Sequence, residues 1–152
     1  MEGNLLKVQP IRNGTVIDHI NANMALKIIQ ILRLSDSGST VSVLINVPSK
    51  KLNKKDMIKI EDRELSKEDS AKLALLSPGA HVNIIRNYTV AEKLPVKIPN
   101  TISNVASCPS TNCISNNERG STSRLELKSE VPLILSCYYC NRRVDENNLV
   151  LN

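Results

Sequence analysis

Four cysteines near the end of the chain stand in two pairs whose spacing suits metal binding. Cys108 and Cys113 enclose Pro-Ser-Thr-Asn, and Cys137 and Cys140 enclose Tyr-Tyr after a gap of 23 residues. A Cys-x-x-Cys turn directs two sulfurs at one point, and a second pair on another hairpin completes the tetrahedron that Zn²⁺ prefers. The four thiols fill all four positions of the tetrahedron and leave none open. The sequence therefore predicts a structural and not a catalytic zinc site.

The cysteines have two alternative roles. Two disulfides would also use all four thiols, but disulfides require an oxidising compartment, and the N-terminus Met-Glu-Gly-Asn-Leu-Leu-Lys does not read as a signal peptide. A redox-active pair of Cys137 and Cys140 would leave the first pair without a role. We therefore favour a metal site and expect a cytoplasmic protein.

Asp18 and His19 are a second candidate group. They stand side by side at the end of a β-branched run, residues 15–20, just before a helical pattern. Binding residues collect at such strand ends. The pair also suggests general base chemistry, but the sequence has no nucleophile at a recognisable spacing and no glycine-rich phosphate loop. We therefore expect a binding role and no active site.

The distribution of the cysteines along the chain predicts two domains. The 152 residues are 41% hydrophobic. No run of about 18 apolar residues exists to span a membrane. All four cysteines follow residue 107, so the preceding part needs an ordinary apolar core, whereas a remainder of roughly 50 residues is near the size that requires a metal. Residues 1–94 carry 14 Lys and Arg against 10 Asp and Glu, and residues 95–152 carry 6 against 5, so the basic excess lies on the first domain.

Hydrophobic periodicity predicts an α+β first domain. Ser66 and Asp69 form a capping box that opens a helix, and Asn21 or Asn23 can cap an earlier one. The order βαββαβ packs two helices on one face of a four-stranded, largely antiparallel sheet, which is the ferredoxin-like arrangement. The expected strands are residues 5–11, 15–20, 41–47, 57–60 and 81–90, and the expected helices are residues 23–34 and 66–76.

Prolines and broken alternation set the expected boundaries. Pro48 is expected to end its strand, an irregularity is expected at Ile84 and Ile85, and two prolines within residues 91–100 indicate a linker. We place the domains at residues 1–94 and 103–152, with the linker region at 95–102. The second domain is expected to be a small all-β zinc-binding unit, with strands at residues 124–128, 133–135 and 149–151.

Five segments carry a resemblance that runs nearly from end to end of the chain. They are Gly-Thr-Val-Ile-Asp-His-Ile (14–20), Lys-Asp-Met-Ile-Lys-Ile-Glu (55–61), Val-Asn-Ile-Ile-Arg-Asn-Tyr (82–88), Asn-Val-Ala-Ser-Cys-Pro-Ser-Thr-Asn-Cys-Ile-Ser (104–115) and Cys-Tyr-Tyr-Cys (137–140). In this order and at these separations, they make the chain similar to the regulatory chain of aspartate carbamoyltransferase.

The resemblance implies a non-catalytic subunit of pyrimidine biosynthesis. Its first domain would bind nucleoside triphosphates, with CTP or UTP as inhibitors and ATP as activator, and its zinc domain would dock on a separate catalytic chain. The regulatory chains would form a homodimer through their first domains. The implied assembly is a dodecamer of two catalytic trimers and three regulatory dimers, with no nucleic acid and no membrane as partner.

The resemblance also implies a nucleotide site. Lys93 and His19 would face the phosphates, Asp18 and Lys59 the ribose, and Lys55 a second nucleotide or its Mg²⁺. These residue types suit a nucleotide, which needs donors for its phosphates, an oxygen partner for its ribose and backbone groups that read its base. The backbone around Val8, Ile11, Ile85 and Tyr88 would read the base, and Val16, Met57, Asn83 and Val90 would line the rest.

Three positions depart from the family pattern or complicate it. Ser110 stands where the family commonly has Asn, and Asn141 where it commonly has an acid, so the polar pairing with the catalytic chain must differ. Pro10 removes a backbone donor beside the base-reading strand.

The competing class is a zinc-ribbon protein that binds nucleic acid. Such a module is expected to carry a basic patch and aromatic side chains for stacking. The whole chain has no Phe, no Trp and only three Tyr, and its basic excess lies outside the cysteine-containing domain. Both features argue against this class.

Overall fold

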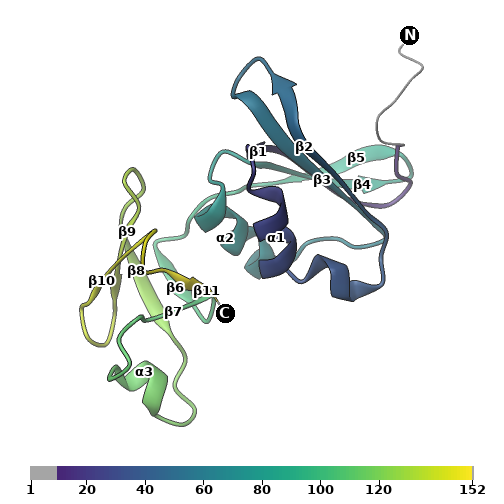
Figure 1. Ribbon diagram of the computed structural model, residues 1–152. Coiled ribbons are helices and arrows are strands. Elements are labelled where there is room, and N and C mark those ends of the chain that lie inside the picture. The colour runs from purple at the N-terminus through teal and green to yellow at the C-terminus, as the bar shows by residue number, and fades with distance from the viewer. Residues whose placement is uncertain (1–9, 152) are drawn as a thin grey trace. The chain divides into compact units, whose positions relative to one another are not determined.

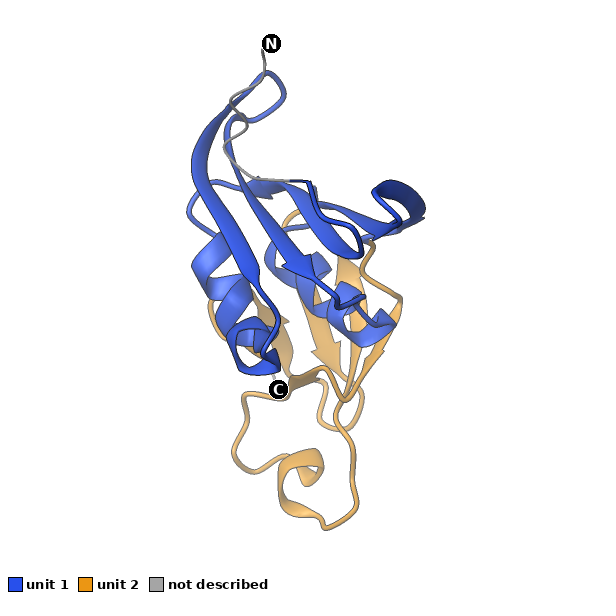
Figure 2. Cartoon of the chain, turned by 90° about the vertical axis from the view of Figure 1, so that its right-hand side faces the viewer, with its two compact units in different colours: residues 1–96 blue, residues 97–152 orange. Residues whose placement is uncertain are grey.

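The computed structural model describes residues 10–151. These residues fall into two compact units, unit 1 up to Val96 and unit 2 from Lys97 onward (Figure 2). The expected strand at residues 5–11 lies almost wholly outside the described range, and Pro10 and Ile11 are not in a strand. Within the described range, no helix has the length and apolar character that crossing a bilayer requires.

Unit 1 contains a five-stranded sheet in the order β2-β3-β1-β4-β5, with α1 and α2 on one of its faces (Figure 1). All neighbouring strands are antiparallel. The expected ferredoxin-like α+β arrangement is therefore confirmed, with β5 added at one edge. The elements are β1 (Gly14–Asn21), α1 (Ala25–Ile31), η1 (Leu34–Ser37), β2 (Val41–Ser49), β3 (Asn53–Glu61), α2 (Lys67–Leu76), β4 (His81–Arg86) and β5 (Thr89–Leu94).

Side-chain alternation gives the sheet of unit 1 one buried face and one open face. Ile17 of β1, Ile58 of β3 and Val82 of β4 belong to the core that the helices cover, and each is at most 1% exposed. Their neighbours in each strand point to the opposite face. Because α1 and α2 lie on the core side, this opposite face, which we call the open face, is not covered by either helix.

The expected single strand at residues 81–90 is wrong, because the chain forms a hairpin there. β4 ends at Arg86, Asn87 and Tyr88 take φ values of 54° and 69°, and β5 begins at Thr89. Two consecutive positive φ values are those of a type I′ turn, which usually carries Asn-Gly. Residues 91–94 therefore belong to the sheet and not to a linker.

The hairpin also contains the expected irregularity. The pairing of β4 with β5 shifts register between Ile84 and Ile85, where two apolar residues are adjacent. A shift of this kind adds a residue to one strand and bends it.

Pro48 does not end β2, which continues to Ser49 and pairs with β3 back to Asn53. β2 is an edge strand, so no further strand requires the N–H that proline lacks. β3 accordingly begins four residues before the expected strand at residues 57–60. Lys54 and Lys55 are therefore part of β3.

α2 begins as expected, but α1 does not. Ser66 Oγ accepts a hydrogen bond from the Asp69 N–H at 3.1 Å and Asp69 Oδ2 accepts one from the Ser66 N–H at 3.2 Å, so the capping box is confirmed. α1 spans only Ala25–Ile31 of the expected residues 23–34, and its N-cap residue is Met24, not an asparagine. The helix ends early because Arg33 takes a left-handed conformation and starts η1.

A buried carboxylate on β3 supplies the missing cap of α1. Asp56 is 0% exposed, and its Oδ2 accepts a hydrogen bond from the N–H of Ala25 at 3.0 Å. Its other oxygen accepts a hydrogen bond from the N–H of Asn46 at 3.0 Å, where the pairing of β2 shifts register. One side chain thus ties both the helix start and the β2 irregularity to the centre of the sheet.

Unit 2 is built from short strands around the cysteines. One sheet has the order β10-β9-β8-β6 and a second pairs β11 with β7. Its buried apolar set is small and includes Ile102, Leu125, Leu135 and Val144. The elements are β6 (Thr101–Ser103), β7 (Ala106–Ser107), α3 (Ile114–Asn117), β8 (Arg124–Ser129), β9 (Ile134–Cys137), β10 (Arg143–Asp145) and β11 (Val150–Leu151).

Replacing Asp56 by Ala is expected to destabilise unit 1 by about 3 kcal/mol, because two backbone N–H groups lose a charged acceptor inside the protein. Asp56→Asn keeps one acceptor oxygen and should lose less. Asp36→Ala, which removes an exposed carboxylate of η1, is the control with the same charge change. Urea unfolding of the three variants measures the difference, and equal midpoints for Asp56→Ala and Asp36→Ala would contradict this role of Asp56.

Candidate functional site

The four cysteines of unit 2 meet at one point. Their sulfur atoms all lie within 4.8 Å of one another, and none is in a disulfide. Two of the separations, from Cys108 to Cys140 and from Cys113 to Cys137, are both 3.6 Å. Four sulfurs bound at about 2.3 Å to one tetrahedral metal ion stand about 3.8 Å apart. The sulfur atoms are therefore arranged as a four-thiolate metal site requires.

Backbone and side-chain donors point at these sulfurs. Cys108 accepts a hydrogen bond from the backbone of Ser110, and Cys137 accepts bonds from the backbones of Tyr139 and Cys140. Ser115 approaches Cys113 with its backbone and its Oγ, the latter at 3.1 Å. Donors of this kind stabilise thiolate sulfur and orient it toward a metal.

Two asparagines of α3 hold the first cysteine loop in shape. The side-chain amide of Asn116 donates to the carbonyls of Cys108 at 2.8 Å and Ser110 at 2.7 Å. That of Asn117 donates to the carbonyls of Thr111 at 2.7 Å and Cys113 at 2.8 Å. Because every one of these acceptors is backbone, the loop geometry depends little on the side chain at position 110.

The second cysteine loop is a tight turn. Asn141 takes φ 61°, and its N–H donates to the carbonyl of Cys137 at 2.8 Å. Asparagine tolerates this left-handed conformation better than most residues do. The sequence departure at Asn141 is therefore compatible with the turn.

The cysteine cluster needs a cation to hold several thiolates. Burial raises the pKa of Cys108 to about 12 and also raises the pKa of Cys137. Burial likewise opposes ionisation of Cys113, but hydrogen bonds from Ser115 lower the pKa of that thiol to about 7. A divalent metal supplies the charge that makes the remaining thiolates favourable.

Unit 1 contains a second candidate site, formed where β1 is irregular. The pairing of β1 with β3 loses register between Ile17 and Ile20, and His19 in this interval takes φ 56°. A bulge of this kind turns side chains away from their regular directions. It leaves Asp18 and His19, which the sequence singles out, half-buried at the same end of the sheet.

Asp18 is held as a carboxylate by its neighbours. Its Oδ1 lies 2.8 Å from Lys55 Nζ and accepts the N–H of His19 at 2.7 Å. Burial opposes ionisation, but the hydrogen bonds and the charge of Lys55 outweigh it and keep the pKa of Asp18 below its usual value. His19 Nδ1 stands 3.6 Å from the other oxygen, so a protonated imidazole would complete an ion pair.

Register places four of the expected site residues in one row across the open face. Val16 of β1 is opposite Lys59 of β3 on one side and Asn83 of β4 on the other. Asn83 is in turn opposite Lys93 of β5. Residues directly opposite in neighbouring strands point to the same face. Met57 and Lys55 continue this face along β3, on alternate positions from Lys59.

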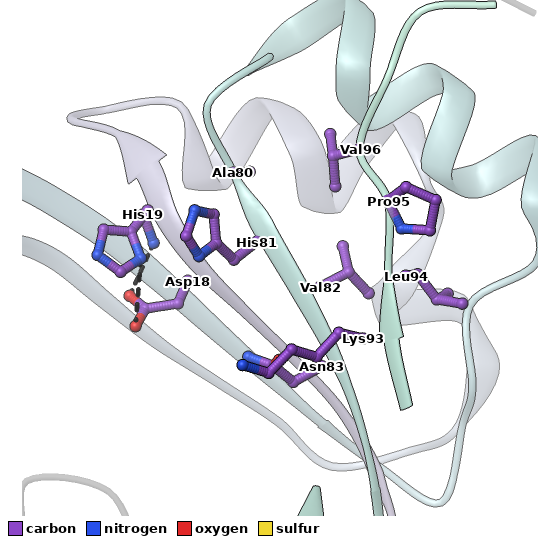
Figure 3. Close-up of a pocket in the computed structure, with 10 residues that line it drawn as sticks. All are labelled: Asp18, His19, Ala80, His81, Val82, Asn83, Lys93, Leu94, Pro95 and Val96. Carbon is purple, nitrogen blue, oxygen red and sulfur yellow. Dashed lines mark hydrogen bonds and ion pairs between the residues drawn. The ribbon is translucent and has the colours of Figure 1, made fainter. Parts of the chain in front are cut away.

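A pocket of about 300 Å³ lies at the Asn83–Lys93 end of this row, beside Asp18 and His19 of β1. This volume is at the lower end of the range for small-molecule sites. Figure 3 shows the imidazoles of His19 and His81 side by side, with Lys93 and Asn83 extending together nearby. The residues that line the pocket are Asp18, His19, Ala80, His81, Val82, Asn83, Lys93, Leu94, Pro95 and Val96.

The residues expected near the base lie at the other end of β1. Gly14, the first residue of β1, is opposite Ile85, which is opposite Val90 of β5. The N–H of Tyr88 donates to the carbonyl of Arg12 at 2.9 Å, which places the chain beside Ile11 against the β4–β5 turn. This end is four residues along β1 from Asp18, or about 13 Å. Val8 lies outside the described residues.

His81 is a pocket residue that sequence reasoning missed. It pairs with Asp18 in the β1–β4 ladder and stands on the same face of β4 as Asn83. The sequence offered one signal: His81 and Asn83 are two positions apart in the expected strand, so their side chains point to the same face. The partner of that strand was not fixed by the sequence, so the meeting of His81 with His19 could not be foreseen.

These features define a class of protein: a chain with a basic pocket on an open sheet face in one unit and a four-cysteine metal site in another. The family described as aspartate carbamoyltransferase regulatory chain, allosteric domain, matches residues 6–97, and the metal binding domain of the same chain matches residues 100–150. The chain belongs to the family of aspartate carbamoyltransferase regulatory chains. The resemblance seen in the sequence is confirmed, as is the prediction of a regulatory and not a catalytic chain.

Relatives from several organisms are similar over nearly their whole length. Regulatory chains of aspartate carbamoyltransferase from Methanothrix thermoacetophila and Thermococcus kodakarensis are 48% and 46% identical to this chain. The matches cover 93% of this chain and 92% of the first relative, and 97% of both chains for the second. The chain of the same description from Photorhabdus laumondii is 42% identical, over 97% of this chain and 96% of its own length.

Removing one metal ligand is expected to unfold unit 2 and leave unit 1 folded. Metal binding supplies on the order of 10 kcal/mol in small modules of this kind, and the apolar core of unit 2 is too small to replace it. Cys113→Ala should therefore abolish metal content and collapse the unit 2 signals in an amide NMR spectrum, while unit 1 signals persist. Thr111→Ala, which removes an exposed side chain from the same loop, is the control. Dispersed unit 2 signals in metal-free Cys113→Ala would contradict this account.

Proposed function

We propose that the open face of unit 1 binds nucleoside triphosphates, and that the bound effector alters the activity of a separate catalytic chain. CTP and UTP are the proposed inhibitors and ATP the proposed activator. The observation that carries this proposal is the cross-strand row of Lys59, Val16, Asn83 and Lys93, which ends beside Asp18 and His19.

The chemistry of the two ends of β1 suits the two ends of a nucleotide. At the pocket end, Lys93 and His19 offer positive charge and N–H donors to phosphates, and Asp18 offers an acceptor to a ribose hydroxyl. Lys59, next to Val16 in the row, is the second proposed ribose partner. At the far end, the backbone around Ile11, Ile85 and Tyr88 is proposed to read the base, with Met57 and Val90 lining the rest.

Lys55 is given a separate role. Its ion pair with Asp18 and its position on the strand next to β1 support a role at the margin of the proposed site. A second nucleotide, with its Mg²⁺, is proposed to bind there.

For unit 2 we propose a structural Zn²⁺, one per chain, bound by Cys108, Cys113, Cys137 and Cys140. Four converging thiols and no carboxylate or imidazole in the cluster favour Zn²⁺ over Mg²⁺ or Ca²⁺. We propose that this domain, residues 103–152, docks on the catalytic chain, and that residues 1–94 form the nucleotide-binding domain, joined by residues 95–102. We also propose a reducing compartment, the cytoplasm, because these cysteines are arranged as metal ligands and not as disulfides.

The two domains have separate roles in the proposed assembly. Regulatory chains pair through their first domains, and three such dimers join two catalytic trimers in a dodecamer. Allostery requires two distinct sites that are coupled in free energy, and the effector site is the one proposed on this chain.

Lys93→Ala and Lys59→Ala are each expected to weaken CTP binding by about 1.5–3 kcal/mol, or roughly ten- to a hundredfold, because each removes a charged hydrogen-bond donor. Metal content should not change. Isothermal titration of the purified chain with CTP measures the effect. Lys67→Ala is the matched control, because Lys67 is an exposed lysine at the start of α2, on the helix side of the sheet. If all three variants bound like the wild type, the nucleotide site would not lie on the open face.

The chain alone is expected to transfer no carbamoyl group and to change the aspartate response of a purified catalytic chain when the two are mixed. CTP and ATP should then shift that response in opposite directions, by a coupling of about 1–3 kcal/mol. Steady-state activity with and without effectors measures it. Turnover by the isolated chain, or a mixture insensitive to every nucleotide, would contradict the proposal.

A further inference from the structure

The chain has only two histidines, and the fold brings them together. His19 and His81 are 62 positions apart in the sequence, yet their ring centroids are 4.5 Å apart and their planes are inclined by 36°. Both line the pocket of unit 1 (Figure 3). Two imidazoles at this separation repel each other when both are protonated.

Most of the charged groups around this pair are cationic. From the β2–β3 hairpin, Lys51 contributes positive charge near His81, and from β5, Lys93 lines the same pocket. From β3, Lys55 is ion-paired with Asp18 of β1, which is the nearby anion. The net positive surroundings oppose protonation of the second imidazole when no anion is bound.

The electrostatics of His81 agree with this geometry. Partial desolvation is the largest of the effects that lower the pKa of His81. The charges of His19, Lys51 and Lys93 lower this pKa further, and the charge of Asp18 opposes them. His81 is therefore largely neutral at neutral pH in the free protein. A polyphosphate carries several negative charges, and its presence in the pocket would reverse the balance.

We propose that His81, which lies next to His19, is a phosphate-binding residue. It takes up a proton when the polyphosphate of a nucleotide enters the pocket. This inference rests on the proposed nucleotide site and adds to it a residue and a linkage to pH. The proton converts a neutral imidazole into a cation with two N–H donors, which suits an anionic oxygen.

The direction of the pH dependence follows from linkage. Below the pKa of His81 in the free protein, the ring is already charged and binding takes up no proton. Above the pKa in the complex, the ring is neutral in both states. Between the two values the affinity falls as the pH rises, by up to about tenfold for each unit by which binding raises the pKa.

The test compares CTP and inorganic triphosphate binding to the full chain at about pH 6 and about pH 8, the range in which histidine titrates. Wild type, His81→Gln and His81→Lys are titrated side by side. The terminal phosphate of the ligand also titrates in this range, but comparison between variants at the same pH cancels that effect. His81→Gln removes the titrating group, and His81→Lys fixes a positive charge at the same position.

For each protein, the affinity at about pH 6 is divided by the affinity at about pH 8. This ratio should be about three- to tenfold larger for the wild type than for His81→Gln. His81→Lys should have the same shallow pH dependence as His81→Gln but bind both ligands more tightly than His81→Gln does at the higher pH. A residue with only a structural role would lose affinity equally in both variants.

Two results would overturn the inference, and they are distinguishable. If all three proteins bind CTP with parallel pH profiles, His81 takes up no proton while the proposed nucleotide site stands. If the wild type binds neither CTP nor triphosphate at either pH, the proposed function fails and the inference fails with it.

Discussion

The two-residue alternation of an antiparallel sheet with helices on one face is the constraint on which unit 1 depends. It sends Ile17, Ile58 and Val82 into the core and their strand neighbours to the open face. The same register that buries the isoleucines therefore aligns Lys59, Val16, Asn83 and Lys93 across four strands. The candidate binding surface is a consequence of core packing, because a one-residue slip of any strand would break both at once.

The fold of unit 2 depends on a different interaction. Its strands are short and its apolar set is small, so the convergence of four sulfurs, with the asparagines of α3 bracing the first loop, replaces a large core. Unit 1 contains no comparable cluster among its described residues and has a core of its own. The two units thus owe their folds to different interactions, a helix-covered sheet in unit 1 and converging cysteines in unit 2.

Sequence patterns predicted the parts of this structure that local chemistry determines. The capping box at Ser66, the strands of alternating apolar residues and the cysteine spacing each carry their own physical signal. The β4–β5 hairpin gave little signal, because Asn87 and Tyr88 form its turn without the glycine that usually marks such a turn. The cap of α1 by Asp56 and the meeting of His19 with His81 depend on which strands pair, and strand pairing is non-local.

The central claim is that one face of one sheet in unit 1 is the effector surface. Amide NMR of the full chain titrated with CTP tests it most directly, because every strand of the sheet reports separately. The account predicts shifts that follow the cross-strand row from Lys93 through Asn83 and Val16 to Lys59, together with His19 and His81 at the pocket, and little change in the residues of α1 and α2 that face away from the sheet. Shifts confined to the helices of unit 1, or to the cysteine loops of unit 2, would contradict it.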